Sequence, residues 1–354
     1  MSKFLHSKYK SITPYDTSSE VESFNDYIRL NTNESPFSPS PLAIKYASQA
    51  ASGLNYYSDP ECRALSTKLA DMLGVSPSQI VFGNGSDEIL NFLFSAFCEH
   101  GAVFPDITYS FYKILAEFHG VNYRTIPLSE FYLLPVDYVD LNGRTIFVAN
   151  PNAPTGLYLI PAAIETLIIQ NPTSLVVVDE AYIDFARGDS ALKLIRRYKN
   201  VVIVRTFSKS RSLAGGRLGY CVTNEELAQD IRNIKNTITP YNINAMTQAA
   251  GLGSLEDNEY HRANIRLICS TRQLVKAALA QMGFDFLDSS ANFLFVRHDK
   301  ISGIKIFEAL KSRKIMIRHF DSLSAWNRIT IGTPEQMQKL LHELGEIINH
   351  EQGI

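Results

Sequence analysis

The sequence predicts an α/β fold in which a large, mainly parallel mixed sheet is flanked by helices and followed by a small α+β domain. Short apolar runs recur between residues 80 and 204, and helix-length stretches separate most of them. Strands that alternate with helices favour parallel pairing through right-handed crossovers. A long charged stretch then precedes further short runs beyond Gly283, and these predict the smaller domain.

Each element follows from the spacing of apolar residues. Leu65, Leu69 and Met72 have helical spacing ahead of Gly74, so residues 61–73 are predicted to form a helix. The predicted strands of the large sheet are 80–82, 102–104, 145–148, 175–178 and 201–204. The small domain is predicted to contain strands at 293–296, 315–317 and 328–331, a helix that ends near Ser312, and a terminal helix from Pro334.

Three segments make up the predicted domain organisation. Residues 1–50 are rich in Ser, Pro, Asn and Tyr, which indicates an N-terminal arm rather than a folded unit, with part of it joining the small domain. Residues 51–283 form the predicted large domain, and residues 284–354 form the predicted small C-terminal domain. The periodic, charged stretch 256–282 is predicted to be one extended helix that links the two.

The composition favours a compact cytoplasmic protein with small-molecule ligands. Hydrophobic residues make up 45% of the 354 residues and charged residues 20%, which argues against disordered and fibrous classes. The formal net charge is -2 without a basic run, so neither nucleic acid nor a membrane is an expected partner. The four cysteines and eight histidines show no metal-ligand spacing, and no metal, secretory signal or membrane span is expected.

The strongest chemical signal is a lysine in the segment after the strand 201–204. Lys209 lies among the hydroxyl residues Thr206 and Ser208 and is followed by Arg211 and Arg217. Cationic neighbours favour a neutral lysine amine that can attack an aldehyde. The hydroxyls and the Arg217 guanidinium are suited to hold a phosphate. Lys209 alone would more often be a solvated loop lysine, so its assignment depends on the other segments.

An acidic residue follows the buried strand 175–178. An unpaired carboxylate at such a place is unfavourable, so Asp179 is expected to face a cation. A protonated pyridine nitrogen is one such cation, and Tyr182 is placed to hydrogen-bond a phenolic oxygen of the same ring. The alternative interpretation is that Asp179 caps a helix and Tyr182 fills the core.

Two turns add polar groups at the ends of other predicted strands. Residues 150–156 contain two prolines and a glycine, which form a rigid turn that presents Asn152. Residues 83–88 open a helix with glycines, whose N–H groups are suited to cradle a phosphate. Glu88 stands where a dinucleotide fingerprint needs a small residue, so a nicotinamide-dependent dehydrogenase is disfavoured. All four segments follow strands at the edge where such sheets bind ligands.

Taken together, these segments resemble the fold-type-I pyridoxal-phosphate enzymes, and specifically the histidinol-phosphate aminotransferases. The resemblance covers nearly the whole chain. Besides the four segments, it rests on SITPY (11–15), LNTNE (30–34), YSDPE (57–61), ANF (291–293) and RITIG (328–332). It implies a homodimer in which residues 51–283 bind pyridoxal 5'-phosphate. It also implies transamination of L-histidinol phosphate with 2-oxoglutarate, which gives imidazole-acetol phosphate and L-glutamate, in histidine biosynthesis.

The resemblance also implies roles for individual residues. The catalytic residues would be Lys209, which holds the cofactor as a Schiff base and moves a proton, together with Asp179 and Tyr182. The cofactor-binding residues would further include Gly85, Ser86, Asp87, Tyr109, Asn152, Thr206, Ser208 and Arg217, with Tyr57 reaching in from the second subunit. The substrate-binding residues would be Tyr15, Asn33, Asn292, Arg318 and Arg328. Arg328 would hold a carboxylate and Arg318 the phosphate of histidinol phosphate.

Three positions depart from the family pattern and bear on the substrate. Ala153 replaces a second Asn of the turn, Gly216 replaces a bulkier residue before Arg217, and Asn327 replaces a Leu before Arg328. The alternatives are an aminotransferase for aromatic or other amino acids, a threonine-phosphate decarboxylase, and a non-catalytic binding protein with the same fold. A substrate-facing Arg318 would favour phosphorylated amines.

Overall fold

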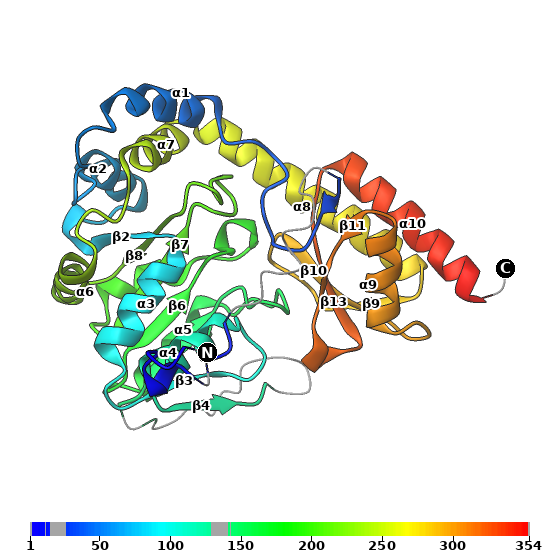
Figure 1. The fold of residues 1–354 in the computed structure, drawn as a ribbon, viewed down its shortest axis with the longest axis horizontal. Coiled ribbons are helices and arrows are strands. Elements are labelled where there is room, and N and C mark those ends of the chain that lie inside the picture. The colour runs from blue at the N-terminus through cyan, green and yellow to red at the C-terminus, as the bar shows by residue number, and fades with distance from the viewer. Residues whose placement is uncertain (1, 11, 15–25, 129–140, 142, 353–354) are drawn as a thin grey trace.

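The structure is a computed structural model that describes residues 2–10, 12–14, 26–128, 141 and 143–352. Within these residues, a seven-stranded sheet forms the centre of a large unit and a four-stranded sheet the centre of a small unit. Figure 1 shows the two units side by side, joined by the long helix α8 (Asn258–Gln281). At about 1.5 Å per residue, this helix is about 36 Å long.

The large sheet is mainly parallel, as predicted. Its strands, in spatial order, are β2 (Ile80–Asn84), β8 (Leu218–Val222), β7 (Val201–Thr206), β6 (Val176–Asp179), β5 (Thr145–Ala149), β3 (Ala102–Pro105) and β4 (Tyr123–Ile126). Only β8 runs antiparallel to its neighbours, β2 and β7. Because β8 is antiparallel to both β2 and β7, these two strands run in the same direction. The carboxyl ends of β2, β3, β5, β6 and β7 therefore meet at one edge.

Both faces of the large sheet are covered by helices. Val176 and Val178 belong to one apolar cluster, whereas Val177 between them belongs to another on the opposite face. The helices on the first face are α2 (Arg63–Leu73), α5 (Pro161–Gln170) and α7 (Ala245–Glu256). The helices on the second face are α3 (Ser86–Phe97), α4 (Phe111–His119) and α6 (Glu225–Ile238). Full burial explains why these strands read as continuous apolar runs.

The small unit packs three helices on an antiparallel sheet. The sheet contains, in spatial order, β12 (Arg318–His319), β13 (Trp326–Thr330), β10 (Phe293–His298) and β9 (Phe284–Phe286). Helices α8, α9 (Gly303–Ser312) and α10 (Pro334–Gln352) contribute to its apolar core. The N-terminal strand β1 (Ile28–Arg29) pairs in parallel with β11 (Ile315–Met316) beside this sheet.

The expectation for residues 1–50 needs one correction. Helix α1 (Pro41–Ala50) is a folded element that packs against α7, and Ala43 lies in the core of the large unit. The Ser40 side chain caps it by accepting a hydrogen bond from the Ala43 N–H at 3.1 Å, and Pro41 suits the first helical position. The surrounding composition, rich in Ser, Pro, Asn and Tyr, concealed this helix. The domain boundaries at residues 50 and 283 stay a prediction.

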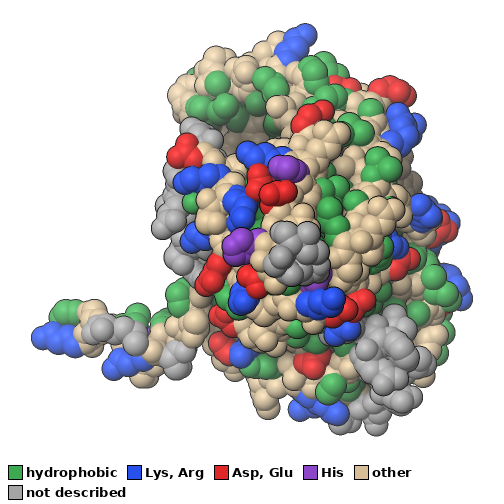
Figure 2. Space-filling model, turned by 90° about the vertical axis from the view of Figure 1, so that its right-hand side faces the viewer, with side chains coloured by type: hydrophobic (Ala, Val, Ile, Leu, Met, Phe, Trp, Pro, Cys, Tyr) green, Lys and Arg blue, Asp and Glu red, His purple; other side chains and the backbone are tan. Residues whose placement is uncertain are grey.

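The predicted helices α2 and α8 are confirmed. Gly74 follows α2 with a φ of +66°, the left-handed conformation expected beyond a helix C-terminus. Among the described residues, no helix is long and apolar enough to cross a membrane. Figure 2, which views the small-unit end, shows acidic and basic side chains interspersed over that face. This face has no broad surface of one charge sign.

Candidate active site

A cavity of about 630 Å³ lies at the carboxyl edge of the large sheet. Its walls come from both units of the molecule. The large unit contributes the ends of β5, β6 and β7 and the start of α3, whereas Arg328 comes from β13. Thr32, Asn33 and Glu34, from the segment after β1, complete the lining. The edge predicted to bind ligands therefore does carry a cavity.

The Lys209 amine lies in this cavity. Strand β7 ends at Thr206, whose hydroxyl donates to Ser208 Oγ at 3.0 Å and accepts from the Ser208 N–H at 3.1 Å. This local pairing fixes the start of the loop that carries Lys209. Lys209 Nζ donates to the Thr32 carbonyl oxygen at 3.0 Å and lies 5.8 Å from the ring centroid of Tyr182. The half-buried amine is thus held between the sheet edge and the N-terminal segment.

Asp179, at the end of β6, is a buried carboxylate with two hydrogen-bond donors. The Tyr112 hydroxyl donates to Asp179 Oδ2 at 3.0 Å, and the Ala181 N–H donates to Oδ1 at 3.2 Å. Burial raises the pKa of Asp179 to about 6, although the two hydrogen bonds act to lower this pKa. No ion pair joins Asp179 to a basic residue within the described part of the chain. A cation in the cavity would stabilise its ionised form.

The start of α3 approaches β8 closely. Gly85 precedes the helix with a φ of +83°, and a side chain there would collide with the Arg217 guanidinium. A side chain at Gly219 would collide with the Ser86 backbone nitrogen. Gly219 is therefore needed for this backbone contact, and the positive φ of Gly85 favours glycine there. Ser86 and Arg217 line the cavity together with Thr206 and Ser208, so helix N–H groups, hydroxyls and a guanidinium converge on one place.

Asp87 links Arg217 to the aromatic side of the site. Arg217 donates to Asp87 Oδ2 at 2.9 Å, and the Tyr109 hydroxyl donates to Asp87 Oδ1 at 3.0 Å. Arg211, the other arginine near Lys209, has its NH1 on the Ser254 carbonyl oxygen at 2.6 Å. The two arginines that were expected to flank Lys209 thus hold partners of their own.

Asn152 is buried in the turn after β5. Its amide nitrogen donates to the Ile107 carbonyl oxygen and to Thr155 Oγ1, and its amide oxygen accepts from Thr108 Oγ1 at 3.0 Å. These bonds fix the turn, while Pro151 and Ala153 line the cavity. Asn152 itself does not line the cavity, so its contact with a ring oxygen stays a prediction.

Tyr182 connects the large unit to the N-terminal segment. Its hydroxyl accepts a hydrogen bond from Asn33 Nδ2 at 2.9 Å, and its ring packs edge-to-face on Phe293 at 5.1 Å. Asn33, with a φ of +56°, is held by Thr330 through two hydrogen bonds of 3.0 Å. Asn292 Nδ2 donates to the Asn33 carbonyl oxygen at 3.0 Å. These residues join three distant parts of the sequence.

Two arginines lie on neighbouring strands at the small-unit side. Arg318 on β12 is the direct register partner of Arg328 on β13, which places both side chains on one face of the sheet. Arg328 lines the cavity and donates to the Asn31 carbonyl oxygen at 2.8 Å. Arg318 is half-buried beside it but does not line the cavity.

Tyr57 also lies away from the cavity in the single chain. Tyr57 is 83% exposed and stacks on Tyr241 with 4.5 Å between ring centroids. It is outside the cavity lining. Tyr15 lies outside the described residues.

Sequence reasoning missed several residues of the site. Tyr112, which donates to Asp179, follows only from the helical spacing of α4 and has the signature of any core aromatic residue. Arg29 NH2 lies 2.7 Å and 2.8 Å from the two carboxylate oxygens of Glu34, and both residues line the cavity. Glu34 stands beside Asn33 in the sequence, and this adjacency was the available signal.

The family follows from comparison with known proteins. The family model described as "Aminotransferase class I and II" matches residues 25–344, and the chain belongs to this family. The chain is 41% identical to a histidinol-phosphate aminotransferase of Brachyspira hyodysenteriae, over 99% of this chain and 100% of that protein. Within the family, it therefore groups with the histidinol-phosphate aminotransferases.

Solved structures agree with this grouping. A histidinol-phosphate aminotransferase from Sinorhizobium meliloti, in complex with pyridoxal-5'-phosphate, has a TM-score of 0.82 and 28% identity, with 92% of this chain and 91% of that chain covered. The enzyme from Clostridium acetobutylicum has a TM-score of 0.84 and 26% identity, with coverage of 91% and 99%. The predicted fold class is confirmed.

Proposed function

We propose that this chain is a pyridoxal-phosphate-dependent aminotransferase that converts L-histidinol phosphate and 2-oxoglutarate into imidazole-acetol phosphate and L-glutamate. The observation that carries the reaction type is the arrangement of Lys209, Asp179 and the start of α3 around one cavity. A reactive amine, a buried carboxylate and an anion-binding helix start are the groups that this cofactor requires. The names of the relatives support the substrate.

The residues of the cavity fit the cofactor. Asp179 is a buried carboxylate with a raised pKa, and a protonated pyridine nitrogen would supply its missing countercharge. Gly85 lets the Arg217 guanidinium approach the helix start, where Ser86, Thr206 and Arg217, which line the cavity, would hold the phosphate. Tyr109 would lie against the ring, and Tyr182 would contact its phenolic oxygen.

The proposed mechanism assigns a task to each polar group. Bound pyridoxal phosphate supplies an aldehyde that condenses with amines and a ring that accepts electrons. The Asp179 carboxylate keeps the ring nitrogen protonated by its negative charge. Lys209 Nζ would take the proton from the substrate Cα as general base and deliver it to the former aldehyde carbon of the cofactor as general acid, and in the second half-reaction it would carry a proton in the opposite direction. The Thr32 carbonyl oxygen holds this amine beside the cavity at 3.0 Å.

The paired arginines support two anionic substrates. Arg328 would hold the carboxylate of glutamate or 2-oxoglutarate, and Arg318 the phosphate of histidinol phosphate. Arg318 is half-buried beside Arg328 but does not line the cavity, so the preference for a phosphorylated amine over the alternative of a generic aromatic amino-acid aminotransferase rests on the relatives.

We further propose a homodimer with shared active sites. Tyr57 belongs to a group of large apolar side chains that are exposed in the single chain, although they are adjacent in sequence or in contact. The members of this group are Leu54, Tyr56, Tyr57, Ile238 and Tyr241. Such a surface is typical of a subunit interface. From it, Tyr57 would reach the cofactor phosphate in the second subunit.

A cofactor absorbance experiment tests the proposal. The purified protein with bound cofactor is mixed separately with histidinol phosphate, phenylalanine and glutamate, and the visible spectrum is followed by stopped flow. We expect rapid conversion to the pyridoxamine form with histidinol phosphate and with glutamate. A faster reaction with phenylalanine than with histidinol phosphate would instead identify an aromatic aminotransferase. The absence of spectral change with every amine would refute the reaction type.

A further inference from the structure

Residues 58–61, which follow Tyr57 in sequence, are held by side chains of helix α6. We infer that Lys235 and Arg232 of α6 are positioning residues, which fix the backbone of residues 58–61 so that Tyr57 points toward the cavity of the second subunit. This inference rests on the proposed shared site. It adds residues that lie outside the cavity and touch neither cofactor nor substrate.

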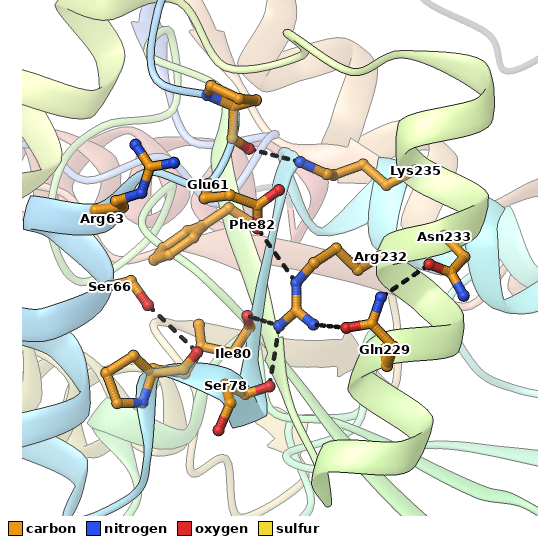
Figure 3. A network of polar contacts seen from close by, with 12 residues as sticks. Glu61, Arg63, Ser66, Ser78, Ile80, Phe82, Gln229, Arg232, Asn233 and Lys235 are labelled. Atoms are coloured by element: carbon orange, nitrogen blue, oxygen red, sulfur yellow. Dashed lines mark hydrogen bonds and ion pairs between the residues drawn. The ribbon is translucent and has the colours of Figure 1, made fainter.

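The first contact is made by a buried lysine. Lys235 is 3% exposed, and its Nζ donates to the Pro60 carbonyl oxygen at 2.6 Å. The second contact is an ion pair between Arg232 Nε and Glu61 Oε2 at 3.3 Å. Figure 3 shows both side chains reaching from α6 toward the segment that bears Glu61. Lys235 thus binds the main chain of Pro60, and Arg232 binds the side chain of the next residue, Glu61.

Arg232 is itself fixed to the large sheet. Its NH2 donates to the Ser78 carbonyl oxygen at 2.9 Å, next to the start of β2, and its NH1 donates to Gln229 Oε1 at 2.9 Å. Because the guanidinium is planar and rigid, these bonds set the direction of the Nε that meets Glu61. Arg232 therefore fixes the position of Glu61 relative to the same sheet that carries Asp179 and Lys209.

The rest of the segment is anchored to α7 and to the chain just before it. The Ser58 hydroxyl donates to the Ile243 carbonyl oxygen at 2.6 Å, and Gln248 Nε2 donates to the Asp59 carbonyl oxygen at 2.8 Å. Tyr57 stacks on Tyr241 in the same region. The Tyr57 side chain is 83% exposed, so we infer that the anchored backbone of residues 58–61 helps Tyr241 to direct it.

The chemistry of Lys235 indicates positioning rather than stability alone. A buried ammonium is unfavourable unless it is well paired, and an apolar side chain of similar length would fill the same space. A hydrogen bond from the ammonium to a main-chain carbonyl does, however, fix distance and direction. Replacement by Met should therefore preserve packing but release the Pro60 carbonyl.

Hybrid dimers separate this role from a general effect on folding. One subunit carries Lys209→Ala, so only the cavity of the other subunit can turn over, and that cavity receives Tyr57 from the Lys209→Ala subunit. Lys235→Met is placed either in the Lys209→Ala subunit or in the Lys209 subunit. We expect the cofactor concentration for half-maximal activity to rise about 3- to 10-fold in the first hybrid, as for one lost hydrogen bond, and to be nearly unchanged in the second.

A second readout needs neither cofactor nor activity. In the apoprotein dimer, amide hydrogen exchange of peptides that cover residues 56–62 should be about 3- to 10-fold faster in Lys235→Met, with exchange in β7 unchanged. Asp230→Asn, at an exposed position of α6, is the matched control and should alter neither readout. Arg232→Gln tests the second anchor in the same hybrids and replaces Lys235→Met if that variant does not fold.

Tyr57→Phe in the Lys209→Ala subunit distinguishes the two levels of the proposal. Suppose that Tyr57→Phe raises the cofactor concentration for half-maximal activity of the working cavity. If Lys235→Met and Arg232→Gln do not raise this concentration, or raise it equally from either subunit, the positioning role is wrong while the shared site stands. If Tyr57→Phe has no effect from the opposite subunit, the shared site is wrong and the inference falls with it.

Discussion

The two walls of the cavity are built in different ways. The cofactor wall, which we propose to hold the cofactor, comes from consecutive strand ends of one sheet, and its residues lie between Ser86 and Arg217. The substrate wall, which we propose to bind the substrate, combines the segment after β1 with Arg328 of the small unit, and Asn292, outside the cavity lining, donates to the Asn33 carbonyl oxygen of that segment. Asn292 Oδ1 on this side is buried and has no hydrogen-bond partner within the described part of the chain.

From this difference we expect the cofactor wall to determine the reaction and the substrate wall to determine which substrate is used. Parallel strands buried on both faces fix the cofactor wall, so its geometry is part of the core. The substrate wall depends on contacts between units, such as Asn33 with Tyr182 and Thr330. Substitutions on the cofactor wall should therefore abolish all transamination, whereas those on the substrate wall should change which substrate is used.

The largest effect is expected for Lys209→Ala. Loss of the amine removes both the covalent anchor and the group that moves the Cα proton, so kcat should fall by at least about 10⁴-fold for every substrate. Some cofactor binding should remain because Asp179 and Arg217 are unchanged. Steady-state assays and equilibrium dialysis measure the two quantities. Lys193→Ala, at an exposed position, is the control, and normal turnover by Lys209→Ala would contradict the assignment.

Asp179→Asn should lower kcat about 10²- to 10³-fold, because the buried countercharge of the ring nitrogen is lost. The same variant should stabilise the apoprotein at neutral pH. Folding raises the pKa of Asp179 from 3.8 to about 6, so its contribution to stability is complete below about pH 4 and is lost as the pH rises through 6. Urea unfolding of both apoproteins should therefore differ by on the order of 1–3 kcal/mol at pH 8.

The comparison between those two apoproteins at low pH is the internal control. At pH 4 the carboxylate is largely protonated in the folded state, so most of the difference in unfolding free energy should disappear. A difference that does not depend on pH would instead indicate a packing effect of the amide.

Substitutions of Arg318 and Arg328 test whether the substrate wall has separate phosphate and carboxylate sites. Arg318→Gln should raise KM for histidinol phosphate about 10- to 100-fold, the size expected for a lost charge-assisted contact, and leave KM for 2-oxoglutarate nearly unchanged. Arg328→Gln should show the opposite preference. Half-reaction kinetics with each substrate alone provide the measurement. Equal effects of both variants on both substrates would contradict separate phosphate and carboxylate sites.

Tyr112→Phe is expected to have the smallest effect on the cofactor wall. The hydroxyl bond lowers the pKa of Asp179, so its removal should raise that pKa above about 6. Cofactor binding should then weaken about 3- to 10-fold at pH 7 and recover at higher pH, as for one lost hydrogen bond. A pH series of cofactor titrations tests this shift. Tyr123→Phe, whose hydroxyl donates to Glu117 far from Asp179, is the control.

The sequence predicts the cofactor wall better than the substrate wall for a physical reason. Asp179 and Lys209 each follow an apolar strand, and local patterns place such residues at a sheet edge without knowledge of distant contacts. Gly219 and Tyr220 interrupt the apolar run of β8. The direction of β8 is also absent from any local pattern. Strand direction depends on pairing partners that are far away in sequence.

The substrate wall required long-range information. The register that places Arg318 opposite Arg328 arises from strand pairing, which the apolar pattern alone does not specify. The Arg29–Glu34 pair and the Tyr112 hydroxyl likewise become recognisable only when the fold brings them to the cavity. Helix α1 was missed because its signals, Ser40 and Pro41, lie within a segment of turn-forming composition.

The reversed strand β8 has a consequence for how the family can vary. Because β8 returns beside β7, residues 207–217 form one excursion that starts and ends at the same sheet edge. This excursion supplies Lys209 near its start and Arg217 at its end. An insertion or deletion within it would shift the amine and the guanidinium relative to each other. Its length should therefore resist change even where the surrounding surface loops tolerate added or lost residues.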